Sequence, residues 1–320
     1  MRVRRLLHTQ PTLGPLIVLL LAVAAFAQLS SRFLTVSNLG LVLAQVTVIA
    51  VLALGQGLVL LTAGIDLSIG AITVFSSVLM AEMVISWGFP GPLALIVGIA
   101  LASVMGVFNG LLVTALKIPP FLATLGTLSI FAALTTVVTS GQTIEASNLP
   151  SILSWTGTII PSGRLRLTYG TVIMLVLFAV LAYALHLTAW GKHVYATGDD
   201  REAARLSGVR TGRVLLSVYI TAGVLYGIAA WILIGRDFAA SPNSGVDFNL
   251  DSITAAVIGG ISLFGGRGRL VGALVGALIV GVFRNGLQLA GVQVEWQGLA
   301  VGVLVLVAVT IDQWIRRVQS

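Results

Sequence analysis

The sequence predicts an all-α polytopic membrane protein, and three observations support this fold class. Charged residues are rare, with 18 Lys or Arg and 11 Asp or Glu in 320 residues. Apolar runs of about 20 residues, the length that a helix needs to cross a bilayer, recur along the whole chain. The mean hydropathy is +1.04 and 57% of the residues are hydrophobic, unlike a soluble domain. Because backbone groups in lipid must be satisfied within the chain, we expect these runs to be helices.

We expect about ten transmembrane helices, some of them broken or half-length. The first follows Arg2, Arg4 and Arg5, a pattern shared with signal peptides cleaved near a site such as Ala25-Phe26-Ala27; we favour an uncleaved helix. The eighth is too short to span alone, which predicts a half-helix or part of a broken unit with the ninth. The expected helices cover residues 13–30, 41–62, 68–87, 92–115, 121–140, 168–188, 213–235, 252–264, 269–290 and 296–313.

The distribution of basic residues predicts that both termini lie in the cytoplasm. Basic residues gather on the cytoplasmic side of membrane proteins. With a cytoplasmic N-terminus, 13 of the 18 Lys and Arg fall inside, and the outside set is Arg32, Arg164, Arg166, Arg236 and Arg284. This placement also accounts for the net charge of +7, so we do not expect nucleic-acid binding.

Residues 1–320 are expected to form a single transmembrane domain with two longer polar loops. Residues 141–167 form the loop expected on the periplasmic side. Residues 189–212 form the loop expected in the cytoplasm, which is the most highly charged part of the chain.

Two breaks in the apolar pattern are weakly similar to each other in sequence. Gly64-Ile65-Asp66-Leu67 parallels Gly260-Ile261-Ser262-Leu263, and a glycine, Gly70 or Gly266, follows at the same offset. Transporters often carry internal repeats with interrupted helices at matching positions. Chance matches are also common in a chain rich in Gly, Ile and Leu, so the similarity leaves both interpretations open.

The sequence contains no pattern typical of an enzyme. It lacks a G-x-x-x-x-G-K-[ST] phosphate loop, since Gly191-Lys192 is followed by His193 and has no upstream glycine. There is no cysteine, and the three histidines are scattered. We therefore expect no catalytic residue, metal site or cofactor, and any ATP hydrolysis must come from another subunit.

The cytoplasmic loop contains a candidate docking helix. Asp199 or Asp200 can cap its start, and Gly208 is a natural stop. Between them, Ala203, Ala204 and Leu206 provide a small apolar surface. Such a helix suits the groove of a partner protein. The alternative is a solvated helix that only fixes topology.

A few polar residues fall within the apolar segments. Asp66 lies in the first break, where it is expected to cap the start of the third helix; a proton or substrate role is the alternative. Gln45, Asn109 and Asn285 are candidates to line a transport path. Such side chains also hold transmembrane helices together, so packing is the alternative for each.

Four blocks of the sequence resemble the ribose-type permeases of bacterial ABC sugar importers. They run in family order between about residues 35 and 312. Phe264 and the residues before it depart mildly from the usual pattern, in which a threonine and a second serine are frequent. The blocks are Gly64–Gly70, Lys117–Gly126, Tyr195–Gly198 with Glu202–Gly208, and Ala256–Gly260 with Gly265–Gly268.

The resemblance implies a permease subunit in the bacterial inner membrane that forms the translocation path for a monosaccharide or related small molecule. A pentose or hexose is the expected cargo. The implied partners are two ATP-binding subunits or one fused tandem ATPase, a periplasmic sugar-binding protein, and a second permease copy in a homodimer or heterodimer. The alternative is a standalone facilitator or an ion-coupled secondary transporter of small polar solutes.

The resemblance also assigns roles to residues. The family's helix-break motif corresponds to Gly64, Asp66, Ser68 and Gly70. The region that couples to the ATPase corresponds to Asp200, Glu202, Ala203, Ala204, Arg205, Leu206 and Gly208. The outer residues Arg32, Arg164, Arg166 and Arg236 could offer charge to acidic groups of the binding protein, or meet lipid headgroups instead.

Overall fold

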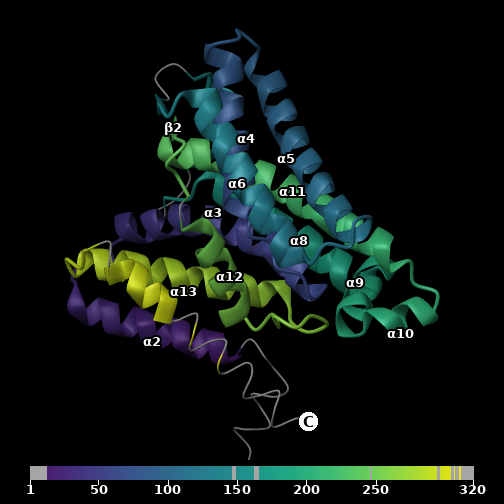
Figure 1. The fold of residues 1–320 in the computed structure, drawn as a ribbon. Helices are drawn as coiled ribbons and strands as arrows, with labels where there is room; N and C mark the ends of the chain where they lie inside the picture. Colours follow the sequence, from purple (N-terminus) through teal and green to yellow (C-terminus); the bar gives the residue numbers. More distant parts are fainter. Residues whose placement is uncertain are drawn as a thin grey trace, which may run out of the picture.

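Helices make up most of the computed structural model, which describes residues 13–145, 149–161, 166–245, 247–293, 296–303, 306 and 310 (Figure 1). Six helices in this part of the chain are long and apolar enough to cross a membrane. They are α3 (Val36–Leu61), α5 (Gly91–Thr114), α6 (Pro120–Thr139), α8 (Tyr169–Leu187), α11 (Thr211–Asp237) and α13 (Leu270–Leu289). Shorter apolar helices are α2 (Leu13–Leu29), α4 (Ile69–Ile85) and α12 (Phe248–Ile258).

The expected helices correspond to these elements in order, with two informative shifts. The helix α3 begins at Val36 rather than at 41, because the Thr35 side chain accepts a hydrogen bond from Asn38 N–H and caps the start. The helix α12 ends at Ile258 rather than at 264, because Gly260 adopts a φ of +86° that an α-helix does not allow.

The tenth expected helix is described only in part. Residues 296–303 are helical, and most of the remainder lies outside the described residues. Both chain ends, with Arg2, Arg4, Arg5, Arg316 and Arg317, also lie outside them. The count of ten spans and the cytoplasmic termini therefore stay predictions.

The helix α3 is the centre of the bundle and is buried along most of its length. It contacts α8, α11, α12 and α13. A helix that is apolar on all sides is buried within a protein, and α3 has apolar residues all round. The helix α2 covers the side of α13, and this layer lies beside α3 and α12 (Figure 1).

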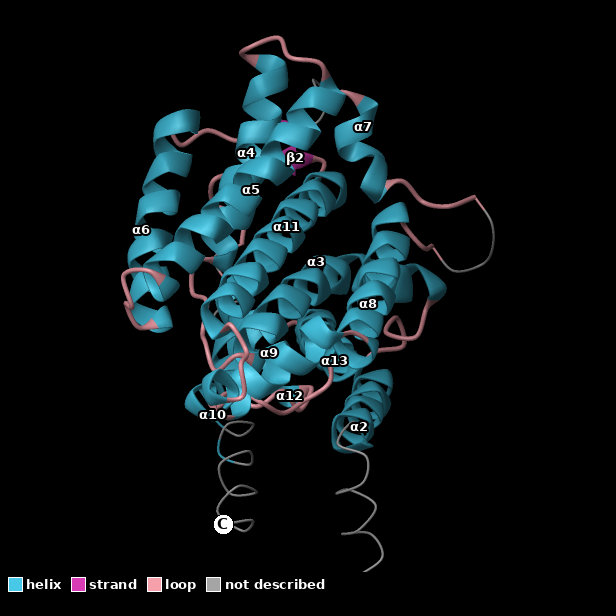
Figure 2. Ribbon diagram, turned by 90° about the vertical axis from the view of Figure 1, so that its right-hand side faces the viewer, coloured by secondary structure: helices cyan, strands magenta, loops and turns pink. Residues whose placement is uncertain are grey.

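A second group of helices consists of α4, α5 and α6, which pack together, and α4 and α5 also pack against α11 (Figure 2). The approach of α5 to α11 is close because glycines face each other. A Cβ atom at Gly106 would lie 2.4 Å from the carbonyl oxygen of Tyr219, and Gly223 is also in contact. Small residues at such contacts let helix backbones pack tightly.

The loop between α6 and α8 packs onto the end of α11. It contains β1 (Ile144–Glu145), α7 (Ser151–Ser154) and the short 3₁₀ helix η2 (Trp155–Gly157). The strand β1 pairs antiparallel with β2 (Ala239–Ala240), which follows α11. Trp231 on α11 donates a hydrogen bond from Nε1 to the Ile152 carbonyl at 2.8 Å. These contacts fix the described part of the 141–167 loop on the bundle.

Candidate functional site

The candidate docking helix forms where the sequence predicts it. Two helices make up this loop, α9 (Ala189–Asp199) and α10 (Arg201–Leu206). Of the two aspartates that could cap α10, Asp200 does so, since its Oδ1 accepts hydrogen bonds from Glu202 N–H and Ala203 N–H, both at 2.9 Å. Gly208 follows the helix with a φ of +88° and turns the chain toward α11. The sequence interpretation of the local structure is confirmed.

The helix α10 exposes an apolar side chain. Leu206 is 80% exposed, whereas Ala204 is buried and holds α10 to the bundle. Asp200, Glu202, Ala203 and Gly208 are exposed. Arg205 pairs with Glu202 at 2.6 Å on the surface, and the hydrogen bond that Arg205 donates to this carboxylate raises the pKa of Arg205. Exposed pairs of this kind contribute little stability. A free leucine side chain among polar groups is therefore the main apolar contact that α10 offers.

A shallow, open basic cleft lies beside the end of α10. Its volume is about 470 Å³, and it is lined by Arg205, Gly208, Val209, Arg210, Thr211, Gly212 and Arg213. Three guanidinium groups around one cleft favour an acidic group from a partner.

The helix α9 links α10 to both glycine-rich breaks. Gly198 lies so close to the end of α3 that a Cβ there would be 1.8 Å from the Leu61 carbonyl oxygen. The same oxygen accepts a hydrogen bond from Gly266 N–H at 3.0 Å. The Tyr195 hydroxyl donates to the Gly268 carbonyl at 2.8 Å, and burial raises the pKa of Tyr195. A shift of α9 would therefore move the end of α3 and the 259–269 loop.

Asp66 is buried in the break between α3 and α4, with three hydrogen bonds to its carboxylate. Ser68 donates from its N–H at 2.8 Å and from its hydroxyl at 2.6 Å, and the Tyr226 hydroxyl donates at 3.3 Å. The amide of Asn109 on α5 in turn donates to Ser68 Oγ at 2.7 Å. Asp66 thus ties the break to α5 and α11.

The cap of α4 differs from the sequence expectation. Asp66 satisfies the N–H of Ser68, the residue before α4, rather than a helical N–H. The helical N–H of Gly70 instead donates to Asn249 Oδ1 of α12 at 2.8 Å. Sequence reasoning missed Asn249, because this partner is far away along the chain and belongs to no local capping pattern.

The three candidate path residues occupy different surroundings in the single chain. Asn109 is buried against Ser68. Asn285 exchanges hydrogen bonds with Asn38 at 2.8 and 3.0 Å, and it is also buried. Gln45 on α3 is half-buried. Asn109 and Asn285 therefore make packing contacts here, and a role for the three in lining a path stays a prediction.

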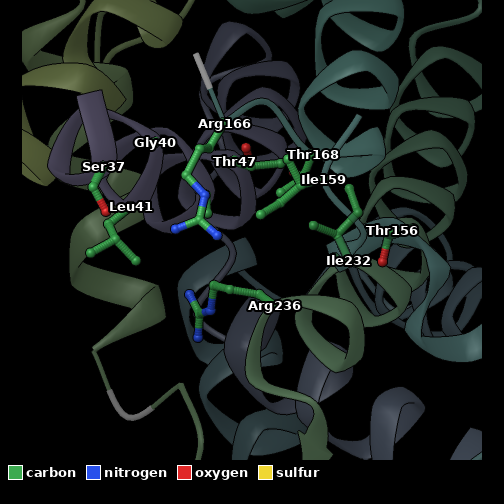
Figure 3. Close-up of a pocket in the computed structure, with 12 residues that line it drawn as sticks. Ser37, Gly40, Leu41, Thr47, Thr156, Ile159, Arg166, Thr168, Ile232 and Arg236 are labelled. Atoms are coloured by element: carbon green, nitrogen blue, oxygen red, sulfur yellow. The ribbon is translucent and has the colours of Figure 1, made fainter. Parts of the chain in front are cut away.

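Two of the four outer arginines line one cavity, which has a volume of about 240 Å³. Arg166 lies in the described part of the 141–167 loop and Arg236 lies near the end of α11 (Figure 3). Arg236 pairs with Asp237, from Nε to Oδ1 at 2.7 Å and from Nη2 to Oδ2 at 3.0 Å. Arg32 is exposed at a turn away from this cavity, and Arg164 lies outside the described residues.

Comparison with known proteins gives concordant matches over nearly the whole chain. A family model described as "Branched-chain amino acid transport system / permease component" matches residues 38–309. A fructose import permease of Rhizobium meliloti is 46% identical over 323 residues, covering 100% of this chain and 90% of the relative.

Two further relatives carry related descriptions. A ribose import permease of Bacillus subtilis (strain 168) is 40% identical over 301 residues, covering 94% of this chain and 92% of the relative. A D-allose transport system permease of Escherichia coli (strain K12) is 31% identical over 305 residues, covering 95% and 92%.

Proposed function

The chain belongs to the family of branched-chain amino acid transport system permease components, and on this premise we propose that it is the transmembrane permease subunit of a binding-protein-dependent ABC importer. It is a multi-pass protein of the bacterial inner membrane. Its cargo is a monosaccharide or a related small molecule, with a pentose or hexose expected. The full-length similarity to fructose, ribose and allose permeases carries this proposal.

The chain supplies the path, and partner subunits supply the energy. The sequence has no phosphate loop, and the relatives are permease components. Either two ATP-binding subunits or one fused tandem ATPase dock on the cytoplasmic side, and a periplasmic binding protein delivers the sugar. A second permease, identical or different, completes the path, to which Gln45, Asn109 and Asn285 are candidate contributors.

The helix α10 is the proposed contact with the ATPase. Leu206 would enter an apolar groove, and the cleft lined by Arg205, Arg210 and Arg213 would receive an acidic side chain. Movement of α10 would pass through α9 to Leu61 and Gly266, the contact between the two glycine-rich breaks. A small rigid-body shift of α10 and α9 can be amplified into a larger movement at a distant gate.

A substitution at Leu206 tests the contact. In a reconstituted complex with its ATPase and binding protein, Leu206→Asp should weaken ATPase affinity roughly tenfold or more, because burial of a leucine contributes about 1.5–3 kcal/mol. Leu206→Met, which keeps the apolar contact, is the matched control. Membrane insertion should be equal in both variants. Unchanged sugar uptake by Leu206→Asp would contradict the assignment of α10.

The complete complex also distinguishes an importer from a standalone transporter. Liposomes that contain the purified chain alone should not accumulate sugar, and accumulation should require the ATPase subunit and ATP. Concentrative uptake by the chain alone would favour an ion-coupled transporter. Equilibration without concentration would favour a facilitator.

The outer arginines are proposed to steer the binding protein through acidic residues on its lobes. Arg32, Arg164, Arg166 and Arg236 are the candidates from the sequence. Arg166 and Arg236 line one cavity, and this cavity supports a ligand for these two arginines in addition to the binding protein.

A further inference from the structure

The cavity between α3, η2 and α11 is an elongated slot with two guanidinium groups in it. One wall is the face of α3 from Ser37 to Thr47, and the opposite walls include Ile159, Arg166 and Arg236. Figure 3 shows both guanidinium groups pointing into the space that faces Ser37 and Leu41. The slot therefore has a cationic group next to an apolar helix face.

The hydrogen-bonding groups that remain free in the slot favour an anion over a sugar. Thr47 and Thr156 donate their hydroxyls to the carbonyls of Leu43 and Trp231, at 2.7 and 3.1 Å. Thr168 caps α8 by accepting from Thr171 N–H. Within the described residues Arg166 has no hydrogen-bond or ion-pair partner. Arg236 uses Nε and Nη2 for Asp237, lies with its Cζ 5.8 Å from the centroid of the Phe248 ring, and keeps Nη1. Apart from the Ser37 hydroxyl, the free groups are thus cationic donors, which match phosphate or carboxylate.

The depth of the slot favours an amphipathic anion. Ser37 and Thr47 are separated by about 15 Å along a helix that rises 1.5 Å per residue, which is half of a bilayer core of about 30 Å. At the rim Leu41 is 57% exposed and Ile159 is 40% exposed. A carboxylate on a docking protein would reach the guanidinium groups and leave this apolar length empty. A lipid would occupy both parts.

We propose that this slot binds an anionic phospholipid. Its phosphate is held by Arg166 and by the free Nη1 of Arg236, and an acyl chain lies along α3 beside Leu41 and Ala44. A zwitterionic headgroup is disfavoured because its cation would approach the guanidinium group of Arg166, which has no carboxylate partner within the described residues. Bound lipid would join α3 to the end of α11 and stabilise the packing of η2 between these two helices.

The purified full-length chain in detergent is sufficient for the lipid-binding measurements, so their result does not depend on any transport partner. Thermal unfolding is followed while short-chain phosphatidylglycerol, phosphatidylcholine or inorganic phosphate is added. Phosphatidylglycerol should raise the Tm of the natural chain. Arg166→Gln should weaken its apparent affinity roughly tenfold or more, since hydrogen bonds to charged groups are the strong ones. Arg32→Gln is the matched control, because Arg32 is an exposed arginine that does not line the slot.

A second variant keeps both charges. Ala44→Trp fills the apolar part of the slot and should also abolish the response to phosphatidylglycerol. An equal response to phosphatidylcholine would overturn the proposal, as would an equal response of Arg166→Gln and the natural chain. An equal response to inorganic phosphate would show a free-anion site instead. An unchanged lipid response of Arg166→Gln, together with lost stimulation of ATP hydrolysis by the binding protein in the complete complex, would assign the site to a protein carboxylate.

Discussion

Asn249 on α12 caps the helix α4 by accepting a hydrogen bond from the Gly70 N–H at 2.8 Å. The first N–H groups of a helix have no partner inside it, and water cannot reach them in a buried position. Gly70 is buried, so the cap must come from another element. A single side chain thereby joins the starts of two short apolar helices.

Removal of this cap should destabilise the chain. We expect Asn249→Ala to lower the free energy of unfolding by about 1 kcal/mol, the usual contribution of a cap. Unfolding by denaturant in detergent micelles measures the change. Asn243→Ala, at an exposed turn nearby, is the control and should stay close to the natural chain. Equal losses in the two variants would contradict the capping role.

Asp66 should be essential for the fold of the first break. Asp66→Ala leaves the Ser68 N–H, the Ser68 hydroxyl and the Tyr226 hydroxyl without their acceptor. We expect a loss of roughly 2 kcal/mol or more, because buried polar groups without partners are costly. Asp66→Asn keeps one oxygen acceptor and should lose less.

Glu82→Ala provides a comparison for Asp66. Glu82 accepts a hydrogen bond from Ser86 at the surface, so its removal should cost far less. Thermal unfolding of the three variants ranks them. If Asp66→Ala matched Glu82→Ala in stability, the buried network would have no structural role.

A Cβ at position 198 should separate α9 from the end of α3. Gly198→Ala forces the new methyl group against the Leu61 carbonyl, and the expected loss is about 1–3 kcal/mol, as for other overpacked sites. Gly14→Ala is the matched control, since nothing lies within 4 Å of its Cβ position and Gly14 lies in α2, outside the basic cleft. Both variants are compared by thermal unfolding and by uptake in the complete complex. Normal uptake in a folded Gly198→Ala variant would argue against coupling through α9.

The reciprocal pair of Asn38 and Asn285 should behave as one unit. Asn38→Ala leaves the buried Asn285 amide unpaired, and Asn285→Ala leaves Asn38 Oδ1 unpaired while Asn38 Nδ2 keeps its bond to the Phe33 carbonyl. Each loss should cost about 1–3 kcal/mol. The double variant should lose less than the two single losses together, with a coupling energy of about 0.5–3 kcal/mol. Additive losses in a double-mutant cycle would show that the two amides act independently.

Much of the fold could be predicted because the length and hydropathy of a membrane helix are local properties. The apolar runs placed nine helices close to their positions, from α2 to α13. The docking helix α10 could also be predicted, because Asp200 and Gly208 lie within a few residues of the backbone groups that they affect.

The candidate site residues could be predicted less well, because polar residues in a bundle look alike in sequence. The sequence makes Asn109 and Asn285 candidates to line a path, yet their amides bond to Ser68 and Asn38 in the single chain. The sequence pattern does not say which way a side chain faces among several neighbouring helices. In the structure the Gly266 N–H bonds to the carbonyl of Leu61 at the end of α3, which joins the Gly260 break to the helix that precedes the Gly64 break. A structural repeat of the two breaks stays a prediction.

By itself, the sequence determined that the chain lies in a membrane and where its helices fall. It also determined the capped helix of the 189–212 loop and the resemblance to sugar permeases. These depend on composition and on residues close together in the chain. Only the tertiary structure decided that Asn249 caps α4, that Asp66 bonds to Tyr226, and that Arg166 and Arg236 share one slot. Each of these joins residues that are distant in sequence, and such partners are selected by how helices pack, which no local pattern encodes.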